Sequence, residues 1–313
     1  MEYLYLAGAC LCFSAQFIFS KLFQKRTDGT LHASMWSNLL SGVSLFAIFF
    51  FLNGFRIGFT WPSALLALLY ALSSIACTCA SIIGLGAASV AVITLYTLLG
   101  GVVLPFFYGV ISLGERPSVF RWIGVSLLIG AAVLPYVINS SKKQEQANDT
   151  SDRKKKLTAA ICCAGVFITN GLISIATKAA SIIENPVSEN DFLLLGTVIR
   201  IAGSVLILGI LMVGKKKRNP LPLDPGTGAP VGVKALLILC VISLCYAYLN
   251  GAGNICSLNC AKTMDASLQF PVISAACIIC SAIIGFLLFR ERPTKGDLAG
   301  ITAAVAGIIF SIF

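Results

Sequence analysis

The chain has little charge, and this scarcity excludes a water-soluble domain. Only 12% of its 313 residues are charged, whereas 57% are hydrophobic and the mean hydropathy is +0.90. A soluble domain of this length uses about a quarter of its residues as charges to cover its surface. Charges are nearly absent over runs long enough to cross the ~30 Å hydrocarbon core of a bilayer. We therefore expect an integral membrane protein surrounded by lipid, in the cell membrane.

Histidine is also scarce, which bears on catalysis and metal binding. The single histidine, His32, lies in a predicted loop, and eleven of the twelve cysteines fall inside apolar spans, with Cys260 three residues after one. Cys277 and Cys280 have a CxxC spacing without a second pair of ligands, so we interpret the cysteines as small packing residues. No nucleophile with a base and no pair of carboxylates stands near a span end. We expect no metal, no cofactor and no enzyme activity.

Acidic residues are missing from the interior of the apolar spans. None of the 13 acids lies in a span core, and a proton-driven exporter of cationic drugs needs a membrane-embedded carboxylate. An anionic, zwitterionic or neutral solute fits better. The net charge of +10 lies mostly in two hydrophilic loops and at span ends, so we expect no nucleic-acid binding.

Ten apolar spans are present, five on each side of a polar, flexible linker at 139–156. We predict an all-α membrane protein with ten transmembrane helices, made of two five-helix repeats at 1–138 and 157–313. Because five is an odd number, the second copy enters the membrane upside down and the repeat is inverted. The first span exceeds a signal-peptide core in length, so we expect it to remain uncleaved. The predicted spans are 3–22, 33–51, 63–84, 89–113, 118–138, 157–182, 191–213, 233–257, 265–289 and 297–313.

A short corner motif occurs once in each half, at an offset of 176 residues. GERPS at 114–118 and RERPT at 290–294 each lie between two apolar spans, and the same offset superposes Tyr70 on Tyr246. Within the motif, Gly114 is suited to end one helix in the left-handed region, and Pro117 is suited to open the next. The shared offset indicates that the chain is a duplication.

Two five-helix halves that each close with this corner resemble the EamA-type branch of the drug/metabolite transporter superfamily. FSAQF at 13–17 resembles that family's aromatic-small-small-amide-Phe pattern, and FITNG at 167–171 is a weaker echo. Arg200 with Ile201 resembles the Arg-Phe pair of a repeat's second helix, where the first copy has Asn38 instead. The resemblance covers the whole chain. It implies a transporter of small organic metabolites, often an exporter, with its site between the halves.

The distribution of basic residues predicts which side of the membrane each loop faces. Of the 23 basic residues, 17 lie in loops after odd-numbered spans and five in loops after even-numbered spans. The positive-inside rule makes the odd loops cytoplasmic and puts both termini outside. Proteins of the EamA type commonly keep both termini in the cytoplasm, so the charge pattern and the resemblance disagree here.

Arg200 is the one basic residue in the interior of a span and not near its end, close to the membrane midplane. A cation at that depth costs from about 3 kcal/mol upward and must face a protein interior or a wet cavity. One interpretation is recognition of a carboxylate or phosphate on the solute. The other is that Arg200 binds carbonyls or amides of neighbouring helices and only holds them together.

Polar residues at matching depths complete the predicted site. Tyr246, Asn250 and Asn254 are each four residues apart and share one helix face. Such a stripe either lines a solute cavity or forms interhelical hydrogen bonds, worth about 0.6 kcal/mol each. The predicted solute-binding residues are Gln16, Asn38, Tyr70, Thr78, Asn170, Arg200, Tyr246, Asn250, Asn254 and Gln269.

The sequence thus predicts a secondary transporter, an exporter or exchanger of small polar or anionic metabolites such as amino acids, working by alternating access. A non-transporting membrane partner protein and a membrane-embedded protein acting on lipid are the alternatives. Close helix packing is expected at the small residues Gly124, Gly130, Gly296 and Gly300, and a homodimer through these faces is possible.

Overall fold

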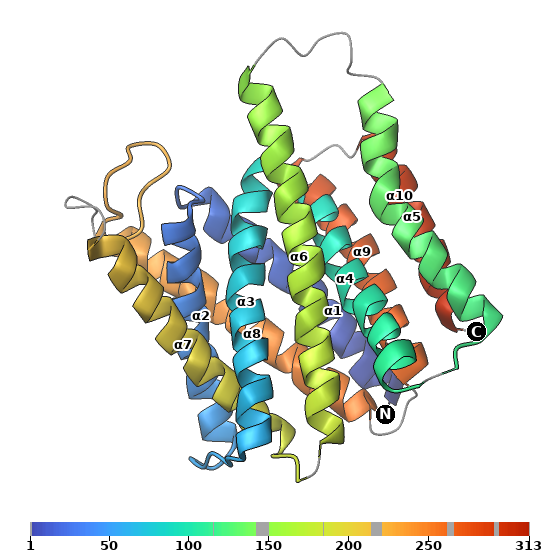
Figure 1. Cartoon of the computed structure of the whole chain (residues 1–313). Coiled ribbons are helices and arrows are strands. Elements are labelled where there is room, and N and C mark those ends of the chain that lie inside the picture. The colour runs from blue at the N-terminus through green and yellow to red at the C-terminus, as the bar shows by residue number, and fades with distance from the viewer. Residues whose placement is uncertain are drawn as a thin grey trace.

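The computed structural model describes residues 2–114, 116–141, 150–183, 185–213, 221–261, 266–290 and 294–312. Side-chain positions are described for these residues except 2, 132–133, 135–141, 150–153, 181, 258, 260–261, 266–272 and 311–312. These parts of the chain form ten helices, which run up and down in one bundle (Figure 1). They are α1 (Glu2–Lys25), α2 (Leu31–Leu52), α3 (Trp61–Ala87), α4 (Val90–Ser112), α5 (Val119–Ser141), α6 (Thr150–Ile182), α7 (Glu189–Val213), α8 (Val233–Ala261), α9 (Ala266–Phe289) and α10 (Lys295–Ile312).

The chain is therefore all-helical, and each predicted span falls on one helix. Seven helices (α1–α4 and α6–α8) contain a stretch long and apolar enough to cross a membrane. Within the described residues, α5 and α9 contribute shorter apolar stretches, Val119–Ala131 and Ile273–Phe289. Apolar helices satisfy their own backbone hydrogen bonds, which is why this chain forms helices where water is absent.

The linker predicted at 139–156 is shorter in the structure. Helix α5 continues to Ser141 and α6 already begins at Thr150, so both ends of the expected linker are helical. Lys and Arg, which fill the start of α6, are good helix formers even though they are polar. The rest of the linker lies outside the described residues.

The two ends of the bundle differ. The carboxyl ends of α1, α3, α5, α7 and α9 lie at the upper end in Figure 1, and both chain termini lie toward the lower end. We call these the basic end and the terminal end, because the loops after odd-numbered helices carry most of the positive charge. Helices α2, α4, α6, α8 and α10 return the chain to the terminal end.

The first five and last five helices pack against each other reciprocally. Helix α1 packs on α8 as α6 packs on α3, α1 packs on α9 as α6 packs on α4, and α2 packs on α8 as α7 packs on α3. Helices α2 and α7 pack on one another, as do α5 and α10. Exchanging each of the first five helices with the helix five places later (α1 with α6, α2 with α7 and so on) therefore leaves this set of contacts unchanged.

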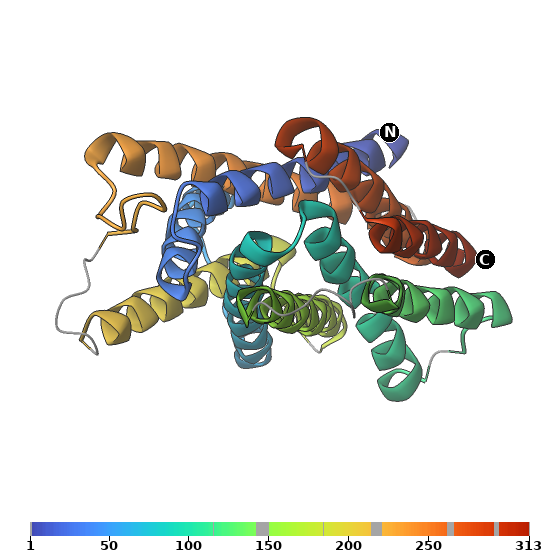
Figure 2. The same cartoon turned by 90° about the horizontal axis from the view of Figure 1, so that it is seen from above.

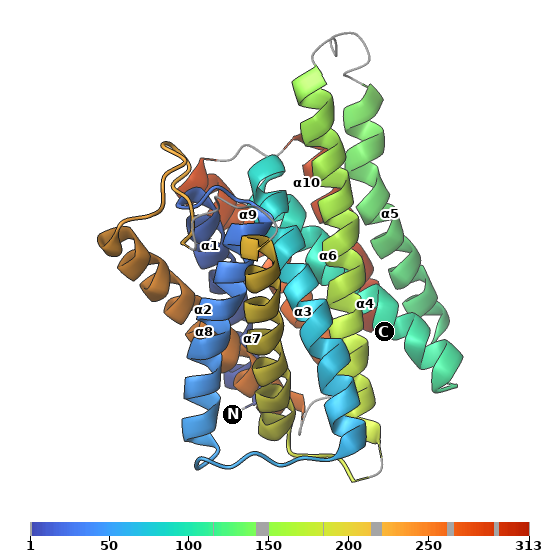
Figure 3. The same ribbon diagram turned by 60° about the vertical axis from the view of Figure 1, so that its left-hand side comes forward.

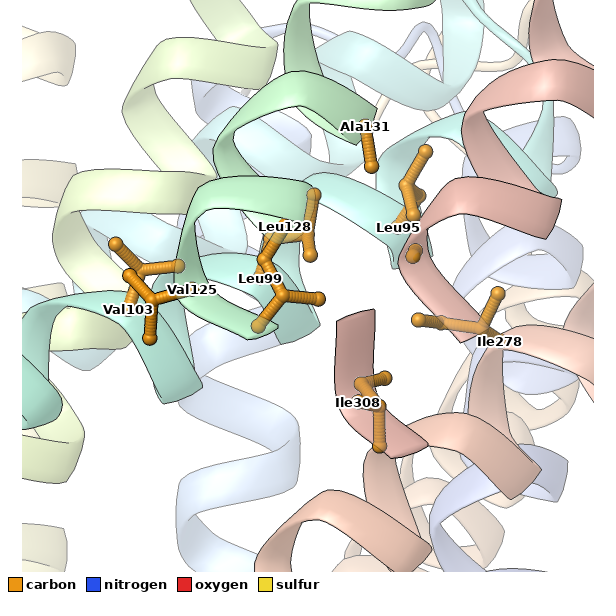
Figure 4. Close-up of a cluster of buried hydrophobic side chains, with 9 residues drawn as sticks. Leu95, Leu99, Val103, Val125, Leu128, Ala131, Ile278 and Ile308 are labelled. Carbon is orange, nitrogen blue, oxygen red and sulfur yellow. The ribbon is translucent and has the colours of Figure 1, made fainter. Parts of the chain in front are cut away.

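Helices α5 and α10 lie side by side at one edge of the bundle (Figure 2). With α4 and α9 they enclose an apolar cluster that includes Leu95, Leu128 and Ile278 (Figure 4). A Cβ on Gly307 of α10 would lie 2.9 Å from the carbonyl oxygen of Gly124 on α5. The small residue Gly124, expected to allow close packing, thus packs within the chain, while a homodimer stays a prediction.

The repeated corner positions α5 and α10. Gly114 has a φ of 67° directly after α4, as predicted, and Arg290 adopts 54° at the equivalent place after α9. The prediction that Pro117 opens α5 is wrong, because the helix begins two residues later, at Val119. Ser118 caps it, and its hydroxyl accepts a hydrogen bond from the Arg121 N–H at 3.3 Å. The other motif residues Glu115 and 291–293 lie outside the described residues.

An ordered hairpin at 221–232 connects toward α8. Leu223 and Pro230 form an isolated antiparallel bridge, and the Asp224 carboxylate accepts hydrogen bonds from the backbone N–H groups of Gly226 and Thr227. These bonds hold the pKa of the exposed Asp224 carboxyl below its ordinary value. The sequence analysis did not predict this hairpin, because the segment is rich in proline and has no apolar periodicity.

Candidate functional site

Arg200 lies midway along α7 and is almost fully buried, with 6% of its surface exposed. Its Nε donates a hydrogen bond to Asn38 Oδ1 of α2 at 2.8 Å. Its Nη2 donates to Ser41 Oγ at 3.0 Å and to Thr78 Oγ1 of α3 at 3.3 Å. Among the residues that the structure describes, no carboxylate forms an ion pair with it. The described hydrogen-bond partners of the guanidinium are therefore all neutral polar side chains.

Asn38 is held in place for this contact. It is completely buried, and its Nδ2 donates to the carbonyl oxygens of Ser34 at 3.2 Å and Ile75 at 3.4 Å. These bonds orient the amide so that Oδ1 faces Arg200. The sequence identified Asn38 as a candidate solute-binding residue at the place where the first half lacks a cation. It did not predict that this amide is the partner of Arg200.

Two tyrosines that the 176-residue offset superposes lie near this cluster. Tyr70 on α3 and Tyr246 on α8 are both close to Arg200. The ring of Tyr70 also meets Phe192 edge-on, with the ring centroids 5.5 Å apart. Both tyrosines are half-buried, so part of each side chain is not covered by neighbouring protein atoms.

A second polar cluster joins α1 to α8. Asn250 Nδ2 donates to Gln16 Oε1 at 2.8 Å, and Asn254 Nδ2 donates to the Asn250 carbonyl at 2.8 Å and to its Oδ1 at 3.3 Å. The predicted common face of Asn250 and Asn254 is present. In this conformation their side chains form hydrogen bonds with each other, and that of Asn250 also with Gln16.

The remaining predicted residues are Asn170 and Gln269. Asn170 Nδ2 donates to the Thr97 carbonyl of α4 at 2.7 Å, where it ties α6 to α4. Gln269 belongs to α9, and its side chain lies outside the described residues. The sequence analysis missed Ser41, whose hydroxyl contributes to Arg200, because serine is common in helix interfaces and carries no spacing signal.

The described cavity beside these clusters is small. It lies among α1, α2 and α8, has a volume of about 10 Å³, and is lined by Ser20, Ser37, Ser243 and Tyr246 together with apolar side chains. Among the described residues, the buried hydroxyl of Ser243 has no hydrogen-bond partner. A volume of this size admits about one water molecule and no metabolite. A larger hollow of about 590 Å³ on α7 is lined only by apolar residues such as Val205 and Ile210.

The described residues form ten helices, seven of them with a stretch long and apolar enough to cross a membrane, and comparison with protein families agrees with a membrane protein. Residues 157–313 match the EamA-like transporter family. The chain belongs to the EamA-like transporter family. This EamA-like protein is thus a multi-pass integral membrane protein of a transporter family, in line with the resemblance of its motifs. No curated protein matched the sequence at the threshold applied.

Proposed function

We propose that this EamA-like protein is a secondary transporter that exports or exchanges small polar or anionic metabolites, such as amino acids or related solutes, in the cell membrane. The observation that carries the proposal is Arg200, a buried cation whose hydrogen bonds all go to neutral side chains. A guanidinium binds a carboxylate or phosphate more strongly than it binds neutral oxygens. An anionic solute therefore competes well for it.

The proposed solute site consists of the two polar clusters and the residues beside them. Arg200 binds the anionic group, and Asn38 and Thr78 hold the guanidinium in place before the solute arrives. The amides of Gln16, Asn250 and Asn254 offer donors and acceptors to the rest of the solute, with Tyr70, Tyr246, Asn170 and Gln269 as further lining residues.

The proposal also includes alternating access between two inverted five-helix halves. The reciprocal helix contacts and the position of both termini toward one end support this arrangement. In the conformation described, the polar side chains of each cluster bind one another, and the small cavity beside Tyr246 admits about one water. Solute entry then requires that α1 and α8, or α2, α3 and α7, move apart.

A panel of ligands tests the function. The purified protein is heated with amino acids, nucleosides, sugars and phosphorylated metabolites, and compounds that raise its melting temperature are then tested for exchange in proteoliposomes. We expect stabilisation by anionic or zwitterionic compounds, because ligands that bind only the folded state stabilise it. Stabilisation only by cationic compounds would contradict the anionic solute. Stabilisation by none of the compounds would favour the non-transporting partner protein, in which the polar side chains at the centre would also bind one another.

We further propose that the basic end faces the cytoplasm, so that both termini lie outside. The 17 basic residues in loops after odd-numbered helices, against five in the other loops, support this orientation. A short epitope at the C-terminus should be accessible to antibody on intact cells. Labelling that requires permeabilised cells would reverse the assignment.

A further inference from the structure

The carboxylate of Asp191, in the first turn of α7, joins the two sets of five helices at the terminal end. Its Oδ1 accepts hydrogen bonds from the Gly58 N–H at 2.7 Å and from Asn53 Nδ2 at 2.8 Å, both in the loop between α2 and α3. Its Oδ2 accepts from Ser188 Oγ at 2.6 Å. One carboxylate thus binds the α2–α3 loop to the start of α7.

A second contact strengthens the same junction. The hydroxyl oxygen of Ser63, near the start of α3, accepts hydrogen bonds from the Val187 N–H at 3.4 Å and from Thr60 Oγ1 at 2.9 Å. Asn53 also donates to the Arg56 carbonyl at 2.7 Å, which folds the loop toward α7. We call these contacts, made by residues 53–63 with 187–191, the terminal latch.

The corresponding loop of the other half makes the equivalent contact at the opposite end (Figures 1 and 3). The hairpin between α7 and α8 lies against the start of α2, where the Asp28 N–H donates to the Leu223 carbonyl at 3.0 Å. Val231 of the hairpin is 4% exposed and packs with Phe23 and Ile242. We call this contact of residues 222–231 with 28 the basic latch.

The two latches differ in chemistry. At the terminal end an ionised carboxylate accepts three hydrogen bonds, and bonds to a charged acceptor are about twice as strong as neutral ones. At the basic end the described link is one backbone hydrogen bond, between the hairpin and Asp28 in the loop before α2, together with apolar packing. The terminal latch is therefore the stronger directional contact in this conformation.

We propose that Asp191 is the switch residue of alternating access, and that its hydrogen bonds to the α2–α3 loop keep the terminal end closed. This inference rests on the proposed function. Opening the terminal end separates α2 and α3 from α7, which breaks the terminal latch, and the basic latch tightens as its own end closes. Because α2 and α7 pack on each other at the centre, next to Arg200, the two ends open in turn and not together.

Amide hydrogen exchange of the full-length protein in nanodiscs tests the inference without any solute. Asp191→Ala should raise the exchange rate of residues 53–60 roughly tenfold, because the Gly58 N–H loses its acceptor. In the same variant, residues 221–232 should exchange more slowly, because the basic end closes as the terminal end opens. Glu189→Gln is the matched control, since Glu189 is an exposed acid in the same helical turn, and it should exchange like the wild type.

The slower exchange of the hairpin is the decisive result. Faster exchange confined to 53–60, or no change at all, would overturn the switch and leave Asp191 a local structural contact. If Asp191→Ala does not fold, Asn53→Ala gives the same comparison, because it removes one donor and leaves the start of α7 intact. Reciprocal exchange in a protein that moves no tested solute would support the latch while rejecting the proposed transport function.

Discussion

Replacing Arg200 by alanine is expected to lower the rate of solute exchange in proteoliposomes by about 10- to 150-fold. The estimate follows from the ~1.5–3 kcal/mol that a hydrogen bond to a charged group contributes. The guanidinium is buried, and its contacts to α2 and α3 are all neutral, so an anionic solute loses its only described cationic partner in the centre. Exchange is measured with a ligand identified by thermal stabilisation.

Two variants separate solute recognition from structural support. Asn38→Ala keeps the cation and removes the bond that orients it, so exchange should fall much less than in Arg200→Ala. Arg200→Lys keeps the charge and loses the forked geometry, so an intermediate rate is expected. If Arg200→Ala exchanges solute at the wild-type rate while remaining folded, Arg200 only holds helices together, which was the other interpretation of this residue from the sequence.

The substitution Gly100→Ala is expected to cause the largest loss of stability. A Cβ on Gly100 of α4 would overlap the backbone carbonyl of Phe167 on α6, and a backbone atom cannot swing aside as a flexible side chain does. Overpacking in a dense interior costs about 1–3 kcal/mol, and a clash with backbone lies at the upper limit. Thermal unfolding of the purified protein should show a clear drop in melting temperature.

Gly130→Ala provides the opposite result in the same assay. Gly130 lies inside α5, and a Cβ there would meet no atom within 4 Å. Alanine in a helix interior is more favourable than glycine by roughly 0.5–1 kcal/mol, so this variant should be as stable as the wild type or slightly more stable. Equal destabilisation by both substitutions would show that the close approach of α4 and α6 does not matter for stability.

Features that depend on local pattern were predictable from the sequence. The ten helices follow from apolar runs bounded by turns, and the left-handed conformation of Gly114 follows from its position in the corner. The shared face of Asn250 and Asn254 follows from the helical period of 3.6 residues. Each of these depends on residues within a few turns of one another.

Features that depend on distant residues were not predictable. Arg200 meets Asn38 across 162 residues of sequence, and Asn250 meets Gln16 across 234. Neither pairing leaves a spacing signal, because nothing in one helix specifies which residue of another helix faces it. The fold of the 221–232 hairpin and its docking near α2 were unpredicted for the same reason.

The sequence alone determined that this is a membrane protein of helices, with a single cation at mid-depth. Water is absent from the bilayer core, so apolar runs of this length have to become helices. Only the tertiary structure decided what the buried polar groups bind. A buried polar group costs free energy unless it forms a hydrogen bond, and the packing of several helices decides which partner it meets. The partners are Asn38 for Arg200, Gln16 for Asn250, and the α2–α3 loop for Asp191.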